Sequence, residues 1–277
     1  MVKDKINRSV CFFMLYHKRP QVTRMSMWHM AKVIKMFNEA GHRAQGFVVG
    51  CASCEPRQKE YAEKLGLGHV SIPNKPLSRK FSHAYQQALL KETDYICKVD
   101  SNNFNSNDYW EKCIDVMHGP KEASFGTNRF CVMSSDPEKQ DTCVFKTRQS
   151  MHLCNSGQFY LNYSLSKSVN FRSIYNENQN CNFDGKINEA MTSKWNESVI
   201  KTISSEPDDC FDVKDGTDIH SYDSYIRKRN GVYPAYKNRN ELVEEYEELK
   251  LLDLGYFKTS CDKIVEPGAD LSELERI

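Results

Sequence analysis

The chain has 277 residues, of which 39% are hydrophobic and 27% are charged, and its formal net charge is +1. This composition is typical of a soluble globular protein with one large α/β domain, or with one domain and a sizeable appendage. The balanced charge gives no overall field for nucleic acid or a membrane surface, and no apolar run approaches the roughly 18 residues of a membrane span.

The eleven cysteines show no disulfide framework, because their number is odd and several lie inside apolar runs, as Cys11 and Cys97 do. This usage predicts a reducing, cytoplasmic setting, or the host cytoplasm if this Asn-, Tyr- and Lys-rich chain is viral. The run 10–16 resembles a short signal-peptide core. It is followed by His17-Lys-Arg-Pro20 and not by a small-residue cleavage site, so we expect it to be the first strand.

The first hundred residues alternate between short apolar runs and segments with helical spacing. Four strand–helix units in this length predict a mainly parallel sheet with right-handed crossovers. Ser78 is a candidate N-cap for the third helix. The expected strands are 9–16, 45–50, 69–72 and 95–99, and the expected helices are 24–40, one that starts at Pro56, and 79–92.

After residue 100 the pattern changes. We expect helices over 107–117 and 186–195, strand-like structure broken by turns over 123–163, and a strand over 210–213. Residues 226–239 contain five basic residues and no acidic one, whereas residues 241–277 contain eleven acidic and four basic ones. In this acidic segment Leu242, Tyr246 and Leu249 are spaced as one helical face.

The fourth expected strand ends at Asp100-Ser-Asn102. Ligands of open α/β sheets bind just beyond the carboxyl ends of strands, so Asp100 is placed where chemistry usually occurs. Carboxylate and amide oxygens two residues apart can hold a hard divalent cation, which in turn can hold a diphosphate. The alternative is that Asp100 and Asn102 only cap the helix that follows.

The order of these pieces resembles the GT-A glycosyltransferases, which have the nucleotide-diphospho-sugar transferase fold, over roughly residues 9–220. This resemblance implies a Rossmann-like, mainly parallel sheet flanked by helices. We expect a GT-A domain over 1–225 and, over 226–277, a C-terminal basic loop and acidic helical extension packed on it. The matching pieces are Tyr16-His-Lys-Arg-Pro20, the segment 74–80, Asp100-Ser-Asn102, Ser156-Gly-Gln-Phe-Tyr160, Phe183-Asp-Gly-Lys-Ile-Asn188 and Asp218-Ile-His220.

The resemblance also implies roles for particular residues. Mn²⁺ or Mg²⁺ would be held by Asp100, Asn102 and His220. A nucleoside-diphosphate sugar, with a UDP-sugar favoured, would contact Asp100 and Ser101, and its diphosphate would contact Lys18, Arg19, Arg79 and Lys80. If the anomeric centre is inverted, Asp184 is the expected base and Glu189 the second choice; a retaining enzyme needs no such base.

Asn102 departs from the family pattern, which has Asp at this position. An amide brings no charge, so we expect weaker metal binding, a cation that arrives with the nucleotide-sugar, or a metal-independent reaction.

The acceptor is suggested by the basic run Arg227-Lys228-Arg229, which is followed by Tyr233 and Lys237. Basic and aromatic side chains together suit a nucleic-acid backbone and exposed bases. The chain is similar to what a bacteriophage enzyme that glycosylates 5-hydroxymethyl-pyrimidines in double-stranded DNA would be, and such an enzyme must extrude a base. The alternatives are a polysaccharide precursor or a protein as acceptor, and a basic loop that pairs with the acidic tail.

Each candidate residue also has a purely structural interpretation. His220 can be an ordinary core or surface histidine, Asp184 before Gly185 a turn or helix cap, and Lys18-Arg19 a solvated pair. A nucleotidyltransferase can share this sheet, but the expected Gly-rich loop after strand one is absent from His17-Lys-Arg-Pro20. A non-catalytic nucleotide-sugar or nucleic-acid binding module is favoured only by Asn102. The oligomeric state is left open.

Overall fold

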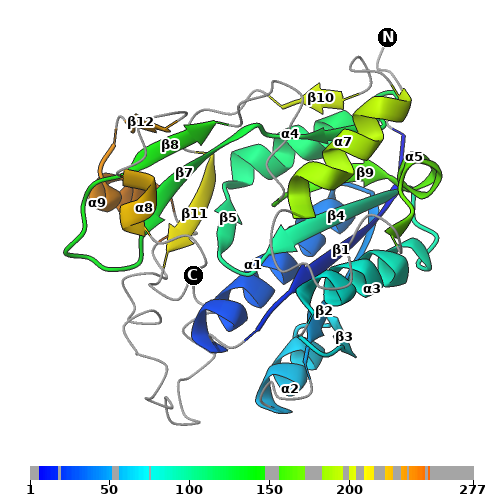
Figure 1. Cartoon of the computed structure of the whole chain (residues 1–277), viewed down its shortest axis with the longest axis horizontal. Helices are drawn as coiled ribbons and strands as arrows, with labels where there is room; N and C mark the ends of the chain where they lie inside the picture. The colour runs from blue at the N-terminus through cyan, green and yellow to red at the C-terminus, as the bar shows by residue number, and fades with distance from the viewer. Residues whose placement is uncertain are drawn as a thin grey trace.

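The fold consists of a large and a small β-sheet with helices packed on them, as a computed structural model shows (Figure 1). The structure describes residues 6–17, 20–51, 56–74, 76–146, 156–171, 183–195, 200–203, 209–214, 222–226, 232–235, 237–246 and 249. Among them, no helix has both the length and the apolar character needed to cross a bilayer.

The large sheet has the strand order β10-β6-β9-β4-β1-β2-β3 among the described residues. Its centre is parallel, because β1 pairs in parallel with both β2 and β4, and β2 with β3. β9 runs antiparallel to β4 and β6, and β10 is parallel to β6. The predicted mainly parallel sheet is thus confirmed. The strands are β1 (Ser9–Leu15), β2 (Arg43–Gly50), β3 (Gly68–Ser71), β4 (Tyr95–Asp100), β6 (Ser124–Gly126), β9 (Gln158–Leu161) and β10 (Ile200–Thr202).

Helices cover both faces of this sheet because its central strands are apolar on both sides, as expected for a parallel sheet. In β1, Phe12 is buried in the core on one face and Phe13 in the core on the other. The first face packs on α1 (Pro20–Glu39), α2 (Pro56–Lys64) and α4 (Asn107–His118). The second face packs on α3 (Leu77–Leu89), α5 (Asn162–Ser168) and α7 (Phe183–Trp195).

The small sheet has the order β12-β8-β7-β11-β5. One of its faces packs on Met25 of α1 and on Leu242 and Leu249. The division of the chain at residue 225 stays a prediction. The remaining elements are β5 (Asn103–Asn105), β7 (Arg129–Ser134), β8 (Cys143–Lys146), β11 (Cys210–Lys214), α8 (Tyr222–Ile226), β12 (Val232–Pro234) and α9 (Arg239–Glu245).

The expected N-cap of α3 is wrong, and the alternative interpretation of Asp100 and Asn102 as caps of the next helix is excluded. The N-cap of α3 is Pro76, which already has the extended backbone of a cap, so Ser78 lies inside the helix, where it is buried. Asp100 and Asn102 do not cap α4, because β5 lies between them and that helix. The cap of α4 is Ser106, whose Oγ accepts a hydrogen bond of 3.1 Å from the backbone N–H of Tyr109.

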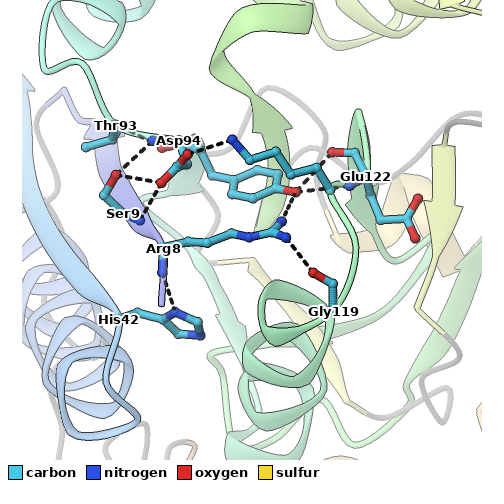
Figure 2. Close-up of polar contacts among 9 residues, drawn as sticks. Arg8, Ser9, His42, Thr93, Asp94, Gly119 and Glu122 are labelled. Atoms are coloured by element: carbon cyan, nitrogen blue, oxygen red, sulfur yellow. Dashed lines mark hydrogen bonds and ion pairs between the residues drawn. The ribbon is translucent and has the colours of Figure 1, made fainter. Parts of the chain in front are cut away.

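Polar contacts join the amino ends of β1 and β4 in the large sheet (Figure 2). The Asp94 carboxylate accepts hydrogen bonds from the backbone N–H of Ser9 at 3.0 Å and from its hydroxyl at 3.1 Å, which ties the start of β4 to β1. The Arg8 guanidinium donates to the Tyr95 hydroxyl at 3.1 Å and to the carbonyl of Gly119. These contacts fix the register of β1 against β4 and leave the carboxyl edge of the sheet for ligands.

His29 of α1 is fully buried where this helix faces α4. Its Nε2 accepts a hydrogen bond of 3.3 Å from the indole N–H of Trp110, and its ring packs edge-on against Phe104. Burial, and to a smaller extent the positive charge of Lys32, lowers the pKa of His29 from 6.5 to about 3. The imidazole is therefore neutral in the folded chain at every pH at which an unfolded histidine would gain a proton.

We expect His29 to make the chain acid-sensitive. Between pH 6.5 and about 3 the unfolded chain binds a proton that the folded chain does not, so stability is lost as the pH falls. The loss should reach about 1.4 kcal/mol per pH unit relative to His29→Gln, which keeps an acceptor for Trp110. Urea unfolding from pH 7 to 4.5 measures it. His83→Gln, at an exposed position of α3, is the control, and equal pH slopes in wild type and His29→Gln would contradict the prediction.

Candidate functional site

The strand order places a topological switch point at the carboxyl ends of β1 and β4. From β1 the chain continues to β2 and β3 on one side, and it returns to β4 on the other side of β1. Such a switch point is where open α/β sheets bind ligands. Leu15 and Asp100 are register partners at the ends of these two strands. Asp100 therefore stands at this switch point, as its place at the end of an apolar run suggested.

The Asp100 carboxylate forms an ion pair with a buried lysine of the same strand. Lys98 lies two residues earlier on the same face of β4, and its Nζ is 2.8 Å from Asp100 Oδ1. The Lys98 side chain is only 2% exposed, whereas that of Asp100 is 31% exposed. The backbone N–H of Asp100 donates to Ser156 Oγ at 3.1 Å, which links it to the segment before β9. The result is an accessible carboxylate whose charge is balanced from inside the protein.

Ser101 and Asn102 form the turn that leads from the large sheet into the small one. The Ser26 hydroxyl of α1 donates to the carbonyl of Ser101 at 2.8 Å. The Asn102 amide donates to Asp212 Oδ1 at 2.9 Å and to the carbonyl of Val213 at 3.2 Å, and the Val213 N–H donates back to the Asn102 carbonyl at 3.0 Å. Asn102 is thus bound to β11, while the Asp100 side chain remains partly exposed.

Asp212 has a cationic partner of its own. Its Oδ2 lies 2.7 Å from Lys214 Nζ, and both side chains are under 9% exposed. The Asn102 amide, the Asp212 carboxylate and the Lys214 ammonium thus form one buried polar chain behind the turn. Its geometry suits the amide donor of Asn102, whereas a carboxylate at residue 102 would face another carboxylate.

Arg79 and Lys80 stand at the start of α3 and differ in what they can reach. Arg79 is exposed. Lys80 is 1% exposed, and its Nζ donates to the carbonyl of Tyr16 at 2.5 Å and to Asn74 Oδ1 at 3.2 Å. Lys80 therefore fixes the loops after β1 and β3, whereas Arg79 is available to an anionic ligand.

The Tyr16 side chain packs over a glycine at the end of β2. A Cβ on Gly50 would lie 2.4 Å from the Tyr16 hydroxyl, so only glycine leaves room for this ring. The hydroxyl also lies 2.8 Å from His69 Nε2 on β3. Burial, followed by the charge of Lys59, lowers the pKa of His69, which favours the neutral imidazole in this contact.

The helix α7 carries both candidate bases. Asp184 is in its first turn, with a side chain outside the described part, and Glu189 has an exposed side chain. A buried polar network fixes α7 to the sheet: the Gln158 amide donates to Asn188 Oδ1 at 2.8 Å, and the Tyr160 hydroxyl donates to Gln158 Oε1 at 2.7 Å.

The predicted DNA-contacting residues, and several of the predicted donor and metal ligands, lie wholly or partly outside the described part of the chain. Tyr233 lies on β12, but its side chain is not described. Lys237 is described, and its ammonium pairs with the Glu245 carboxylate. Outside the described residues lie Lys18, Arg19, His220, Arg227, Lys228 and Arg229.

The described donors at this edge do not by themselves fit a divalent cation. Asp100 is already paired with the Lys98 ammonium, and the amide nitrogen of Asn102 is turned toward Asp212. Across the described ranges, no three His, Cys, Asp or Glu side chains converge as metal ligands. The predicted third ligand, His220, falls outside these ranges, so the Mn²⁺ or Mg²⁺ site stays a prediction.

Sequence reasoning missed Lys98, Asp212, Lys214, Gln158 and Asn188. Lys98 had a readable signal, because a lone lysine in an apolar strand two residues before Asp100 must share its face. Asp212 and Lys214 are partners two residues apart, but no local signal links them to Asn102, which lies 110 residues from Asp212. Gln158 and Asn188 are likewise separated by 30 residues.

Solved structures share this fold. The chain superposes on residues 1–349 of Staphylococcus aureus TarS with a TM-score of 0.50 and on a longer TarS structure with 0.51, at 14% identity in both cases. These matches cover 74% of this chain but only 60% and 36% of the two TarS chains. TarS 1–349 with UDP-GlcNAc matches at a TM-score of 0.48 and 15% identity, over 79% of this chain and 64% of that one. A 4-diphosphocytidyl-2C-methyl-D-erythritol synthase matches at 0.46 and 10% identity, over 73% of this chain and 90% of that one.

The sequence alone finds no relative. No protein-family model matches it. No curated protein matches it either. The likeness to TarS therefore shows the fold, a mainly parallel α/β sheet of the GT-A type.

Asn102→Asp tests the geometry of the turn. The new carboxylate would lie against the Asp212 carboxylate, which Lys214 already neutralises, so we expect a loss of about 1–3 kcal/mol of unfolding free energy at pH 7 without added metal. Asn102→Ala, which removes the hydrogen bonds without adding charge, should be less destabilised. Urea unfolding at pH 7 and pH 4 compares them, and the difference should shrink at pH 4 as carboxylates gain protons. An Asp variant as stable as wild type at pH 7 would contradict the arrangement.

Proposed function

We propose that the chain is a glycosyltransferase that uses a nucleoside-diphosphate sugar, with a UDP-sugar as the favoured donor. The observation that carries the proposal is the partly exposed carboxylate of Asp100 at the topological switch point of this fold. TarS, with which the chain shares its fold at TM-scores of 0.50 and 0.51, has also been solved with UDP-GlcNAc. Since the matches span only part of TarS, its whole-chain activity is not carried over.

The reaction needs positive charge where the diphosphate leaves. When a sugar is transferred, negative charge grows on the departing diphosphate, and fixed cationic groups lower the barrier by stabilising it. Among the described residues, Arg79 is exposed at the start of α3, and we propose that it meets the diphosphate together with Lys18 and Arg19, which follow β1 in the sequence. Asp100 and Ser101 would contact the donor.

Asp184 is the proposed base for an inverting transfer. It would take the proton from the acceptor hydroxyl as that oxygen attacks the anomeric carbon, while the diphosphate leaves from the opposite side. Its place in the first turn of α7 gives it a defined support, because Asn188 one turn later is bound to Gln158 of the sheet. Glu189 is the second candidate.

Donor binding and base catalysis can be separated. We expect UDP to raise the melting temperature of the wild-type chain, since ligand at 100 times its dissociation constant stabilises by about 2.7 kcal/mol. Asp184→Asn should keep this shift but lower kcat for sugar transfer by roughly 10²–10⁴, and Glu189→Gln should leave kcat within a few fold. If neither UDP nor any nucleotide-sugar in a panel shifts the melting temperature, the proposal fails. If Glu189→Gln carries the loss instead, the base is reassigned.

Double-stranded DNA with 5-hydroxymethyl-pyrimidines stays the proposed acceptor. Its support is the basic and aromatic run Arg227-Lys228-Arg229 with Tyr233, which follows α8. A polysaccharide or protein acceptor remains the alternative. The seven described cysteines are all buried, which supports the reducing cytoplasmic setting that we propose.

Salt dependence tests the DNA acceptor. Replacing Arg227, Lys228 and Arg229 by alanine should weaken DNA binding and reduce the slope of log K against log salt by about 0.9 for each phosphate that these side chains no longer neutralise. The matched control replaces Arg57, Lys59 and Lys64, three exposed cations of α2, so that the net charge changes equally. Fluorescence anisotropy at several salt concentrations measures both. Equal slopes in the two triple variants would remove DNA as the acceptor of this run.

A further inference from the structure

Lys98 is an unusual residue for its position. β4 alternates between the two cores of the large sheet, and Lys98 follows Ile96 on the face covered by α3 and α7. Its neighbour across the sheet is Gln158 of β9, which is fully buried. An ammonium group in such a place must have a charged or polar partner. The carboxylate of Asp100, 2.8 Å away, is that partner.

Lys98 is also confined to this position. Its Nζ lies 5.2 Å from the centre of the Phe81 ring on α3, and its side chain is 2% exposed. The Lys98 ammonium could reach solvent only if α3 moved away from the sheet, because Phe81 of this helix packs over it. The positive charge at Asp100 is therefore a fixed part of the fold, and any second cation at this carboxylate must be accommodated beside it.

A divalent cation at Asp100 would meet this charge directly. Hard cations bind carboxylate oxygens at about 2.0–2.6 Å, so the ion would approach the oxygens that the ammonium already neutralises. Like charges in a partly buried site repel strongly, because little water screens them. Asn102, the second residue of the motif, brings no negative charge to offset this repulsion, and its amide is bound to Asp212.

We propose that Lys98 is the built-in counter-cation of Asp100, that it excludes divalent cations from this carboxylate, and that a nucleoside diphosphate binds at this edge without metal. The last part of this inference rests on the proposed function, whereas the exclusion of the metal does not. Lys98 then acts on the donor site through Asp100, as a positioning residue that keeps the carboxylate in place. The charge of the diphosphate is met by cationic side chains alone.

Manganese binding to the full chain tests the exclusion directly. Free Mn²⁺ is followed by electron paramagnetic resonance during titration of wild type, Lys98→Met and the double variant Lys98→Met, Asp100→Asn. Lys98→Met keeps the length of the stem and removes the charge, so it should bind one Mn²⁺ per chain at least about tenfold more tightly than wild type, a difference of about 1.4 kcal/mol. The double variant should lose this site.

A matched control removes a lysine from another ion pair of the same length. Lys112 Nζ lies 2.8 Å from Asp209 Oδ2, in a contact between α4 and the start of β11. Lys112→Met should not create the Asp100-dependent site. Lys98→Gln is made as a second variant, and circular dichroism melts identify which variants are folded. If wild type binds one Mn²⁺ that Asp100→Asn removes, or if no folded Lys98 variant gains a site, the exclusion by Lys98 is overturned.

Binding of UDP separates this inference from the proposed function. Isothermal titration of wild type with UDP in EDTA and in Mn²⁺ should give dissociation constants that agree within about twofold, a difference of about 0.4 kcal/mol. Binding that requires Mn²⁺ would overturn the metal-independent site while leaving the glycosyltransferase intact. An absence of UDP binding in both buffers would overturn both the proposed donor and its metal-independent binding, and the manganese titration would still decide the role of Lys98.

Discussion

The structure depends on the turn at Asp100–Asn102, where the chain leaves the large sheet and enters the small one. The turn is pinned on three sides, by Ser156 before β9, by Ser26 of α1 and by Asp212 and Val213 of β11. These contacts come from segments far apart in the sequence, so the turn can form only when both sheets are assembled. This constraint places the Asp100 carboxylate at the switch point of the large sheet and turns the Asn102 amide toward β11.

Buried charges are concentrated around this turn. Lys98 and Lys80 lie beneath the carboxyl edge, and Asp212 pairs with Lys214 behind it. Burying such groups stabilises a fold little, but removal of one partner typically costs about 3–5 kcal/mol, because the other charge is then left unpaired. We therefore interpret these pairs as devices that fix geometry at the site. The apolar cores on the two faces of the sheet supply the stability that offsets the cost of burying them.

Much of the fold could be predicted because each signal was local. The apolar run of β1 and the helical spacing in α1 gave the strands and helices of the first hundred residues, and their alternation gave the parallel sheet. The position of Asp100 followed in the same way, since a strand that ends in a carboxylate places it at the sheet edge. The cap of α3 was misplaced because Ser78 has the chemistry of a cap, whereas Pro76 has its backbone geometry.

By itself, therefore, the sequence determined the elements, their order and the place of Asp100, because hydrophobic periodicity and chain order are properties of neighbouring residues. Only the tertiary structure decided what surrounds this carboxylate. The amide of Asn102 looked like a metal ligand by spacing, but it binds Asp212, 110 residues away, and no local pattern encodes that contact. Side-chain partners across two sheets are set by the strand order and register, which exist only once the chain has folded.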